Sequence, residues 1–133
     1  MKYRLMDFLA CPYDKHFPLE LYIVETVKYE EREFVFKKKP ACELYCAFKN
    51  KKIEELGGED PGCEECIKYE VKTGVLYCPE CGRWWPIKDE IPIILPDKLR
   101  KKDSDLEFLK KIKDKLPEKI VVEGKPWALG KEG

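Results

Sequence analysis

The sequence predicts an α+β fold with a small antiparallel β-sheet, a short N-terminal helix, a cysteine-rich insertion and a C-terminal helix. Three observations predict this class. Several short segments are rich in β-branched and aromatic residues and are separated by turn residues, as antiparallel strands are. Ser104 to Leu116 has the caps and the apolar stripe of an amphipathic helix. The 133 residues include seven cysteines, most of them closely spaced, as in small domains that a metal or disulfides stabilise.

Length and composition limit the possible functions. A chain of 133 residues is long enough for one ordinary domain and too short for a large catalytic fold. Charged residues make up 39%, but the 26 basic and 26 acidic residues cancel, which removes the overall attraction for phosphates expected of an autonomous nucleic-acid binder. There is no Gln, a single Asn and a single Ser, a composition that indicates a hyperthermophilic source.

The N-terminal segment predicts a short helix. Apolar residues recur at helical spacing from Arg4 to Ala10, and Pro12 ends the helix. Asp7 interrupts this apolar stretch, which is therefore not typical of a secretory signal. No apolar run reaches the roughly 18 residues that span a bilayer. We therefore expect a cytoplasmic protein that does not enter the membrane.

The following segments predict strands and then an insertion. Pro18 to Tyr29 and Glu33 to Lys38 are rich in β-branched and aromatic residues. Pro40 to Cys66 differs, because it holds four cysteines, a Lys/Glu stretch and glycine breakers but little apolar material. We expect three parts, namely a β core of residues 1–39 and 67–100, an insertion of residues 40–66, and a helix and tail of residues 101–133.

A hairpin and two further strands are expected to complete the sheet. Ile67 to Val71 and Val75 to Tyr77 flank a short loop that ends in Gly74, and glycine supplies the backbone conformation that such turns need. Trp84 to Lys88 and Ile91 to Leu95 have the composition of two short strands. The proline in the second of them cannot donate a ladder hydrogen bond, which places that segment at a sheet edge or at the start of a strand.

The C-terminal region predicts one clear helix. Ser104 to Glu107 form a capping box, and Pro117 ends the helix that follows. Its apolar stripe predicts packing on the sheet. Lys119 to Val122 are expected to add a last strand, and Trp127 to anchor the tail.

Cys78-Pro-Glu-Cys81-Gly is the strongest single motif. Two cysteines separated by two residues, with glycine after the second, form a tight loop whose amides can face the sulfurs, which is a metal-binding knuckle. A redox Cys-x-x-Cys is the alternative, but that motif opens a helix. The Trp-Trp-Pro sequence that follows is extended, so the sequence favours a metal.

A knuckle needs two further ligands, and two pairs compete to supply them. Seven cysteines and one histidine make eight soft ligands, enough for two tetrahedral zinc sites. Cys63 and Cys66 lie near in sequence and would complete a zinc ribbon. Cys11 and His16 lie in a loop directly after the first helix, and Asp14 is an alternative oxygen ligand less suited to a thiolate-rich site. The predicted sheet is zinc-ribbon-like.

Three separated motifs give the chain a family resemblance. They are Arg4-Leu-Met-Asp-Phe-Leu-Ala-Cys-Pro12 followed by Pro18-Leu19, then Gly74-Val-Leu-Tyr-Cys-Pro-Glu-Cys-Gly-Arg-Trp-Trp-Pro-Ile87, then Ile91-Pro-Ile-Ile-Leu-Pro96. In this combination and order, the sequence resembles the tRNA methyltransferase subunit 112 family, of archaeal type. Members of that family are small zinc-binding proteins that activate methyltransferases of the translation apparatus.

The resemblance implies a zinc site and a partner. The family joins two N-terminal ligands to the late Cys-x-x-Cys, which here gives Cys11, His16, Cys78 and Cys81, with histidine in place of the usual cysteine. Glu90 stands where the family typically has glycine, so the turn there is expected to differ. The implied partner is a class I, S-adenosylmethionine-dependent methyltransferase acting on tRNA, rRNA or a translation release factor. The two proteins would form a heterodimer that contacts RNA only through the enzyme.

The strands after the knuckle offer a docking edge. Large apolar residues on short, proline-marked strands can accept a partner's strand and fill its pockets. We expect about half of these apolar residues to be ordinary core. The expected partner-binding residues are Trp84, Trp85, Ile91, Pro92, Ile93 and Leu95.

A second quartet remains in the insertion, formed by Cys42, Cys46, Cys63 and Cys66. It has three possible states. A second structural zinc would stabilise a segment with little apolar content. Two disulfides are compatible with a hyperthermophilic source. The third possibility is free thiols.

No segment predicts a catalytic site. The chain has no glycine-rich phosphate loop, its histidine is better used as a ligand, and a zinc with four protein ligands has no open position for water. We therefore expect a non-enzyme that stabilises and orders a partner. The alternatives are a zinc-ribbon module that binds RNA or DNA directly, supported by basic runs such as Lys98 to Lys102, and, more remotely, a thiol oxidoreductase.

Overall fold

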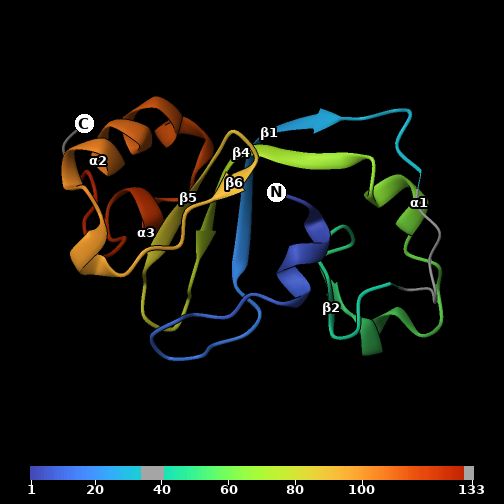
Figure 1. Ribbon diagram of the computed structural model, residues 1–133. Helices are drawn as coiled ribbons and strands as arrows, with labels where there is room; N and C mark the ends of the chain where they lie inside the picture. The colour runs from blue at the N-terminus through green and yellow to red at the C-terminus, as the bar shows by residue number, and fades with distance from the viewer. Residues whose placement is uncertain (34–40, 131–133) are drawn as a thin grey trace.

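The computed structural model describes residues 1–33 and 41–130. Four strands form an antiparallel sheet in the order β1-β4-β5-β6, with short helices on both sides (Figure 1). The strands are β1 (Glu20–Lys28), β4 (Tyr69–Tyr77), β5 (Trp84–Lys88) and β6 (Ile91–Pro92). The helices beside them are η1 (Tyr3–Asp7), η3 (Asp97–Leu99), α2 (Lys102–Ile112), η4 (Lys113–Lys115) and α3 (Glu118–Val121). The predicted α+β class with an antiparallel sheet is confirmed.

Both faces of the sheet are buried. Side chains alternate along β5, so Trp85 joins Met6 in the cluster under the N-terminal segment, and Trp84 joins Leu109 and Ile120 in the cluster under the C-terminal helices. Figure 1 shows these helices on one side of the sheet and η1 with the insertion on the other. The two clusters form the core that fixes the ends of the strands.

β4 is one continuous strand, so the hairpin expected between Ile67 and Tyr77 is wrong. β1 pairs with β4 along its whole length, with a bulge near the middle. Gly74 serves close packing rather than a turn, because a Cβ atom there would lie 2.6 Å from the carbonyl oxygen of Tyr22. The residues on both sides of Gly74 therefore belong to one strand, and the chain does not reverse direction at the glycine.

The C-terminal region agrees with the expectation in part. α2 and η4 cover the predicted helix from Ser104, and α2 begins two residues earlier. The strand expected at Lys119 to Val122 is wrong, because most of this segment forms α3, whose N-cap is Pro117. Trp127 anchors the tail as expected, since its carbonyl oxygen accepts a 2.9 Å hydrogen bond from the Trp84 indole.

The insertion is a small lobe, and the strands described in it pair only with each other. It contains β2 (Tyr45–Cys46), β3 (Lys51–Lys52), η2 (Ile53–Leu56) and α1 (Cys63–Cys66), and β2 pairs with β3 in a separate two-stranded sheet. The strand expected at Glu33 to Lys38 lies outside the described residues, apart from Glu33, which has no regular structure. The division of the chain into three parts remains a proposal.

Asp7 ties this lobe to the N-terminal segment. Its buried carboxylate accepts hydrogen bonds from three successive backbone amides, those of Glu43 (2.9 Å), Leu44 (2.7 Å) and Tyr45 (2.8 Å). Burial raises the pKa of Asp7, but the three backbone hydrogen bonds outweigh burial and lower it overall. Asp7 therefore stays ionised and fixes the chain before β2.

The turn between β5 and β6 is left-handed at both central residues, although neither is glycine. Asp89 has φ 47° and Glu90 has φ 71°, the signs that a two-residue type I′ hairpin requires. The Tyr29 hydroxyl donates a 2.8 Å hydrogen bond to the Glu90 carboxylate.

None of the helices in residues 1–33 and 41–130 has both the length and the apolar character of a membrane span.

Candidate functional site

The first of two cysteine loops follows η1 and runs from Cys11 to His16. The Cys11 amide donates to the His16 carbonyl at 3.0 Å, and the Lys15 amide donates to the Cys11 carbonyl at 2.9 Å. Lys15 has φ 66°, which turns the chain back. The backbone amides of Tyr13 and Asp14 also act on the Cys11 thiol and oppose the rise of its pKa. These contacts form a knuckle around the sulfur.

The second loop, from Cys78 to Arg83, repeats this arrangement. The Cys78 amide donates to the Arg83 carbonyl at 2.9 Å, and the Gly82 amide donates to the Cys78 carbonyl at 2.8 Å. Gly82 has φ 80°, and the backbone amides of Glu80 and Cys81 oppose the rise of the pKa of the Cys78 thiol. Both loops also begin with Cys-Pro, so they are two copies of one local structure.

This equivalence places Asp14 at the position of the second ligand. Asp14 follows the first cysteine of its loop by three residues, as Cys81 does, whereas His16 corresponds to Arg83. Four ligand atoms all lie within 4.8 Å of one another, and they belong to Cys11, Asp14, Cys78 and Cys81.

The structure thus brings together three of the four expected ligands and adds Asp14 in place of His16. His16 lies two residues beyond the ligand position, where the chain leaves the loop. Its backbone amide donates a 2.9 Å hydrogen bond to the Asp14 carboxylate. The sequence signal for this equivalence is the Cys-Pro start that both loops share, and it does not by itself decide between Asp14 and His16.

The spacing of the group fits a tetrahedral zinc ion. The sulfurs of Cys11 and Cys81 are 3.7 Å apart, and the Cys78 sulfur lies 3.5 and 3.6 Å from the two Asp14 carboxylate oxygens. With Zn–S near 2.3 Å and Zn–O near 2.1 Å, a regular tetrahedron has edges of about 3.8 Å between sulfurs and about 3.6 Å between sulfur and oxygen. Three thiols and one carboxylate are also a donor set that zinc accepts.

The charges of the group favour a cation. Burial raises the pKa of Cys11, and it raises the pKa of Cys78 to about 12, although backbone amides act in the opposite direction. Without a cation the two thiols therefore keep their protons. The pKa of Asp14 is lowered, chiefly by the hydrogen bond from the His16 amide, so the group retains a negative charge. Zinc binding would displace the thiol protons.

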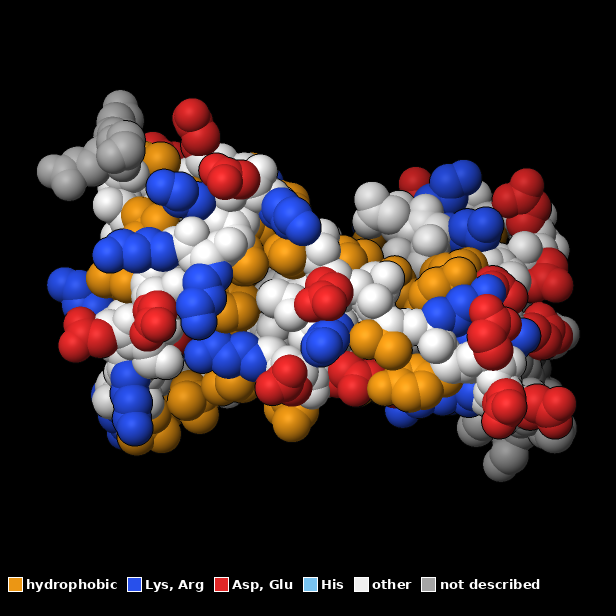
Figure 2. Space-filling view, turned by 90° about the horizontal axis from the view of Figure 1, so that it is seen from above, with side chains coloured by type: hydrophobic (Ala, Val, Ile, Leu, Met, Phe, Trp, Pro, Cys, Tyr) orange, Lys and Arg blue, Asp and Glu red, His pale blue; other side chains and the backbone are white. Residues whose placement is uncertain are grey.

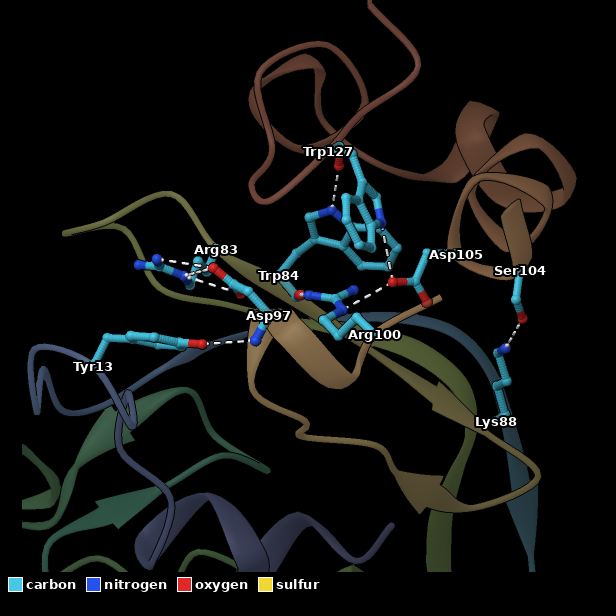
Figure 3. Close-up of polar contacts among 9 residues, drawn as sticks. All are labelled: Tyr13, Arg83, Trp84, Lys88, Asp97, Arg100, Ser104, Asp105 and Trp127. Atoms are coloured by element: carbon cyan, nitrogen blue, oxygen red, sulfur yellow. Dashed lines mark hydrogen bonds and ion pairs between the residues drawn. The ribbon is translucent and has the colours of Figure 1, made fainter. Parts of the chain in front are cut away.

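A clamp outside the ligands also joins the two loops (Figure 3). The Arg83 guanidinium lies 3.7 Å from the centre of the Tyr13 ring and forms an ion pair with Asp97 at 3.0 Å. The backbone amide of Asp97 donates a 2.7 Å hydrogen bond to the Tyr13 hydroxyl oxygen. The clamp was missed from the sequence, because no spacing rule relates residues so far apart.

The second cysteine quartet lies in the insertion lobe, at the other end of β4. Cys42, Cys46, Cys63 and Cys66 line one pocket, and no disulfide joins the cysteines within the described ranges. Burial raises the pKa of Cys42 to about 11 and that of Cys66 to about 12, and the neighbouring thiols act in the same direction.

The zinc-ribbon pairing of Cys63 and Cys66 with the Cys78 loop is not formed. The nine residues of β4 lie between the two pairs, and an extended strand of that length separates its ends by about 25 Å. The hairpin that would have brought the pairs together is absent, because β4 does not turn.

Two of the expected partner-binding residues are core residues instead. Trp84 and Trp85 are both 0% exposed. Both lie on β5, an inner strand of the sheet whose two faces are covered. Because side chains alternate along a strand, one tryptophan is buried on each face. Neither offers surface to a partner, and this part of the expected docking edge is wrong.

The rest of the expected edge reaches the surface. β6 is the outermost strand of the sheet. Ile91 is 61% exposed and Leu95 is 37% exposed, while Pro92 and Ile93 are half-buried. Leu99, 57% exposed, extends this apolar edge. It was missed because it lies within a basic run, which is typical of a solvated face.

A groove of about 190 Å³ runs beside this edge. Its apolar lining is Pro86, Ile93, Leu95 and Leu99, and its polar lining is Lys88, Arg100, Lys101, Ser104 and Asp105. Arg100 is buried, forms a 2.8 Å ion pair with Asp105 and lies 4.6 Å from the centre of the Trp84 ring. Figure 3 shows this arginine beside the indoles of Trp84 and Trp127. The groove therefore has a rigid base.

Charge is evenly mixed on the face seen in Figure 2. Lysine and arginine side chains alternate there with aspartate and glutamate, and apolar groups lie between them. No field of one sign covers this face, in agreement with the zero net charge of the chain.

The family comparison agrees with this geometry. A family model described as Trm112p-like protein matches residues 2–90. The match includes η1, both cysteine loops, the insertion and the sheet as far as the turn after β5. Among curated proteins, none matches the chain. Because the match covers more than half of the sequence, the chain belongs to the Trm112p-like family of small, metal-binding activator subunits of methyltransferases.

Proposed function

We propose that this chain is the non-catalytic activating subunit of a class I, S-adenosylmethionine-dependent methyltransferase that modifies tRNA, rRNA or a translation release factor in the cytoplasm. The two proteins form a heterodimer. The chain covers an apolar surface of the enzyme, and this raises the enzyme's solubility and its affinity for the methyl donor. RNA is contacted only through the enzyme.

The exposed apolar edge carries this proposal. β6 is an outer strand, and an outer strand can accept a strand from another chain. Ile91, Leu95 and Leu99 present apolar side chains along it, and the groove beside them offers room for side chains of the partner. The core behind the edge is formed by two fully buried tryptophans, so the edge is rigid before binding.

The metal has a structural part in the proposal. Cys11, Asp14, Cys78 and Cys81 hold one zinc ion, which when bound supplies a four-ligand crosslink with no open position for a substrate. The crosslink ties the loop after η1 to the loop before β5. It thereby fixes the position of β5, the strand with which β6 pairs.

Replacing the two candidate fourth ligands separately tests the zinc site. Asp14→Ala removes one oxygen ligand, so we expect a 10-fold or greater loss of zinc affinity in competition with a chelator, a loss typical of a damaged metal site. His16→Ala keeps all four ligands and should bind zinc as the wild type does. Loss of zinc in His16→Ala and retention in Asp14→Ala would restore the histidine as the ligand.

Copurification with the enzyme tests the docking edge. The full chain, tagged and expressed in its native cell, should recover a methyltransferase, identified by mass spectrometry. Ile91→Asp places a charge in the proposed interface and should reduce the recovered enzyme at least 10-fold. Leu44→Asp is a matched control, because Leu44 is also 61% exposed but lies in the insertion.

Two results would contradict the proposal. One is recovery of RNA or ribosomes without any methyltransferase. The other is equal loss of the enzyme in the two variants, since a docking edge at β6 predicts that only Ile91→Asp loses it. Direct RNA binding would also show a steep decrease of affinity with salt.

A further inference from the structure

The insertion lobe has too little apolar material to hold its own fold. Its buried apolar residues, among those described, are Leu56, Pro61 and two cysteines, Cys46 and Cys63. β2 and β3 have two residues each, and a hairpin so small is not stable in water without further packing. The lobe therefore needs a crosslink, which its four cysteines can form.

The four cysteines come from two segments that meet at one pocket. Cys42 lies three residues before β2 and Cys46 is the last residue of β2, while Cys63 and Cys66 are the first and last residues of α1. All four line the same pocket, whose remaining lining is Arg4, Ala41, Pro61 and Ile67. The pocket measures about 20 Å³, enough for one water-sized particle. A zinc ion fits in that space.

Backbone contacts hold both segments in place around the pocket. The Ala41 amide donates a 3.4 Å hydrogen bond to the Cys63 sulfur. The Cys66 amide donates to the Gly62 carbonyl at 2.9 Å, which closes the turn between the two cysteines of α1. On the other side, the Asp7 carboxylate fixes the three amides between Cys42 and Cys46. These contacts place the backbone of both segments around the pocket.

We propose that Cys42, Cys46, Cys63 and Cys66 bind a second zinc ion, separate from the ion between the two cysteine loops. Each thiol releases its proton to solvent as its sulfur coordinates the metal, and no oxidation or reduction occurs. Four sulfur donors with no oxygen select zinc over calcium or magnesium. The sulfurs move inward on binding, since only the first group already has all its ligand atoms within 4.8 Å among the described residues.

This second ion is structural and local. It joins the loop before β2 to α1, so it stabilises the insertion lobe and leaves the sheet and the β6 edge unchanged. The inference goes beyond the proposed function, because a methyltransferase subunit with one zinc would dock in the same way. Failure of the second site therefore does not bear on the docking edge.

Metal counting on the full chain tests the proposal. Protein purified under reducing, oxygen-free conditions should carry two zinc ions per chain in native mass spectrometry. Cys63→Ser/Cys66→Ser should carry one. Cys78→Ser/Cys81→Ser is a matched control with the same Cys-x-x-Cys spacing, and it should also carry one, retaining the ion of the insertion.

Cobalt provides a second readout, and its metal count uses the wild type alone. Titration of the metal-free wild type with Co²⁺ should saturate at two equivalents. In Cys78→Ser/Cys81→Ser, the remaining cobalt should show the intense charge-transfer absorption of four thiolates. The proposal is overturned if the wild type holds one metal by both methods. It is also overturned if the unreduced protein is lighter by two hydrogen atoms per disulfide, with all four insertion cysteines blocked to alkylation.

Discussion

Replacing Asp7 by Asn tests how the insertion is attached to the rest of the protein. One carboxylate oxygen, Oδ1, accepts from the amides of Leu44 and Tyr45, and the other, Oδ2, accepts from the amide of Glu43. Asparagine keeps one oxygen for the first two amides. Its NH₂ group faces the third amide, which is also a donor, so that hydrogen bond is lost.

The cost follows from these three bonds. Losing a buried hydrogen bond to a charged group costs about 1.5 to 3 kcal/mol, and turning two charged bonds into neutral ones costs about 0.5 to 1 kcal/mol each. We expect Asp7→Asn to lower the free energy of unfolding by about 3 kcal/mol at pH 7 in urea denaturation of the zinc-loaded protein. Asp114→Asn, an exposed control in η4, should change it by less than about 0.5 kcal/mol.

The pH dependence gives a second test of Asp7. Its pKa in the folded protein is below the ordinary value of 3.8, so the unfolded chain takes up the proton first as the pH falls. The stabilisation is complete above pH 3.8 and is lost as the pH falls through the folded-state pKa. The difference in free energy of unfolding between wild type and Asp7→Asn should therefore become smaller as the pH falls. If the two proteins differ by less than about 1 kcal/mol at pH 7, or if their difference stays the same down to pH 2, the stabilising role of the Asp7 carboxylate is refuted.

Three further substitutions have expected outcomes. Gly124→Ala should lower the free energy of unfolding by about 2 kcal/mol, because its Cβ would lie 2.4 Å from the Ile120 carbonyl oxygen; an unchanged melting temperature would contradict this. Glu90→Gly should raise it by about 1 kcal/mol in the same assay by relieving a left-handed residue, and destabilisation would show that the turn is not strained. Arg100→Met should cost about 3 kcal/mol in urea denaturation, since it leaves the buried carboxylate of Asp105 without its ion pair; a neutral result would mean that the pair adds no stability.

The sheet was largely predictable, because its strands have the composition and punctuation of antiparallel strands. β1, β5 and the start of β6 lie where the sequence places them. The hairpin error at Gly74 has a physical cause, since a glycine that permits close backbone approach and a glycine that permits a turn look the same in sequence. Lys119 to Val122 were assigned by composition, and the preceding proline and packing against Trp84 made them helical instead.

The candidate site was predictable in its cysteines but not in its fourth ligand. Cys11, Cys78 and Cys81 follow from spacing and resemblance. Choosing Asp14 over His16 required the hydrogen bonds of both loops, which show that the two are copies of one structure. Side-chain exposure was also hard to predict from the sequence. The alternation of side chains along a strand does not reveal that both faces of the sheet, and so both Trp84 and Trp85, are covered.

Hydrogen exchange of the heterodimer with the copurified methyltransferase tests the docking edge most directly. We expect the enzyme to slow exchange of the backbone amides in residues 91–99, with no change in the insertion at residues 41–66. Protection confined to the insertion or to α2 and α3, with residues 91–99 exchanging as in the free chain, would contradict a docking edge at β6.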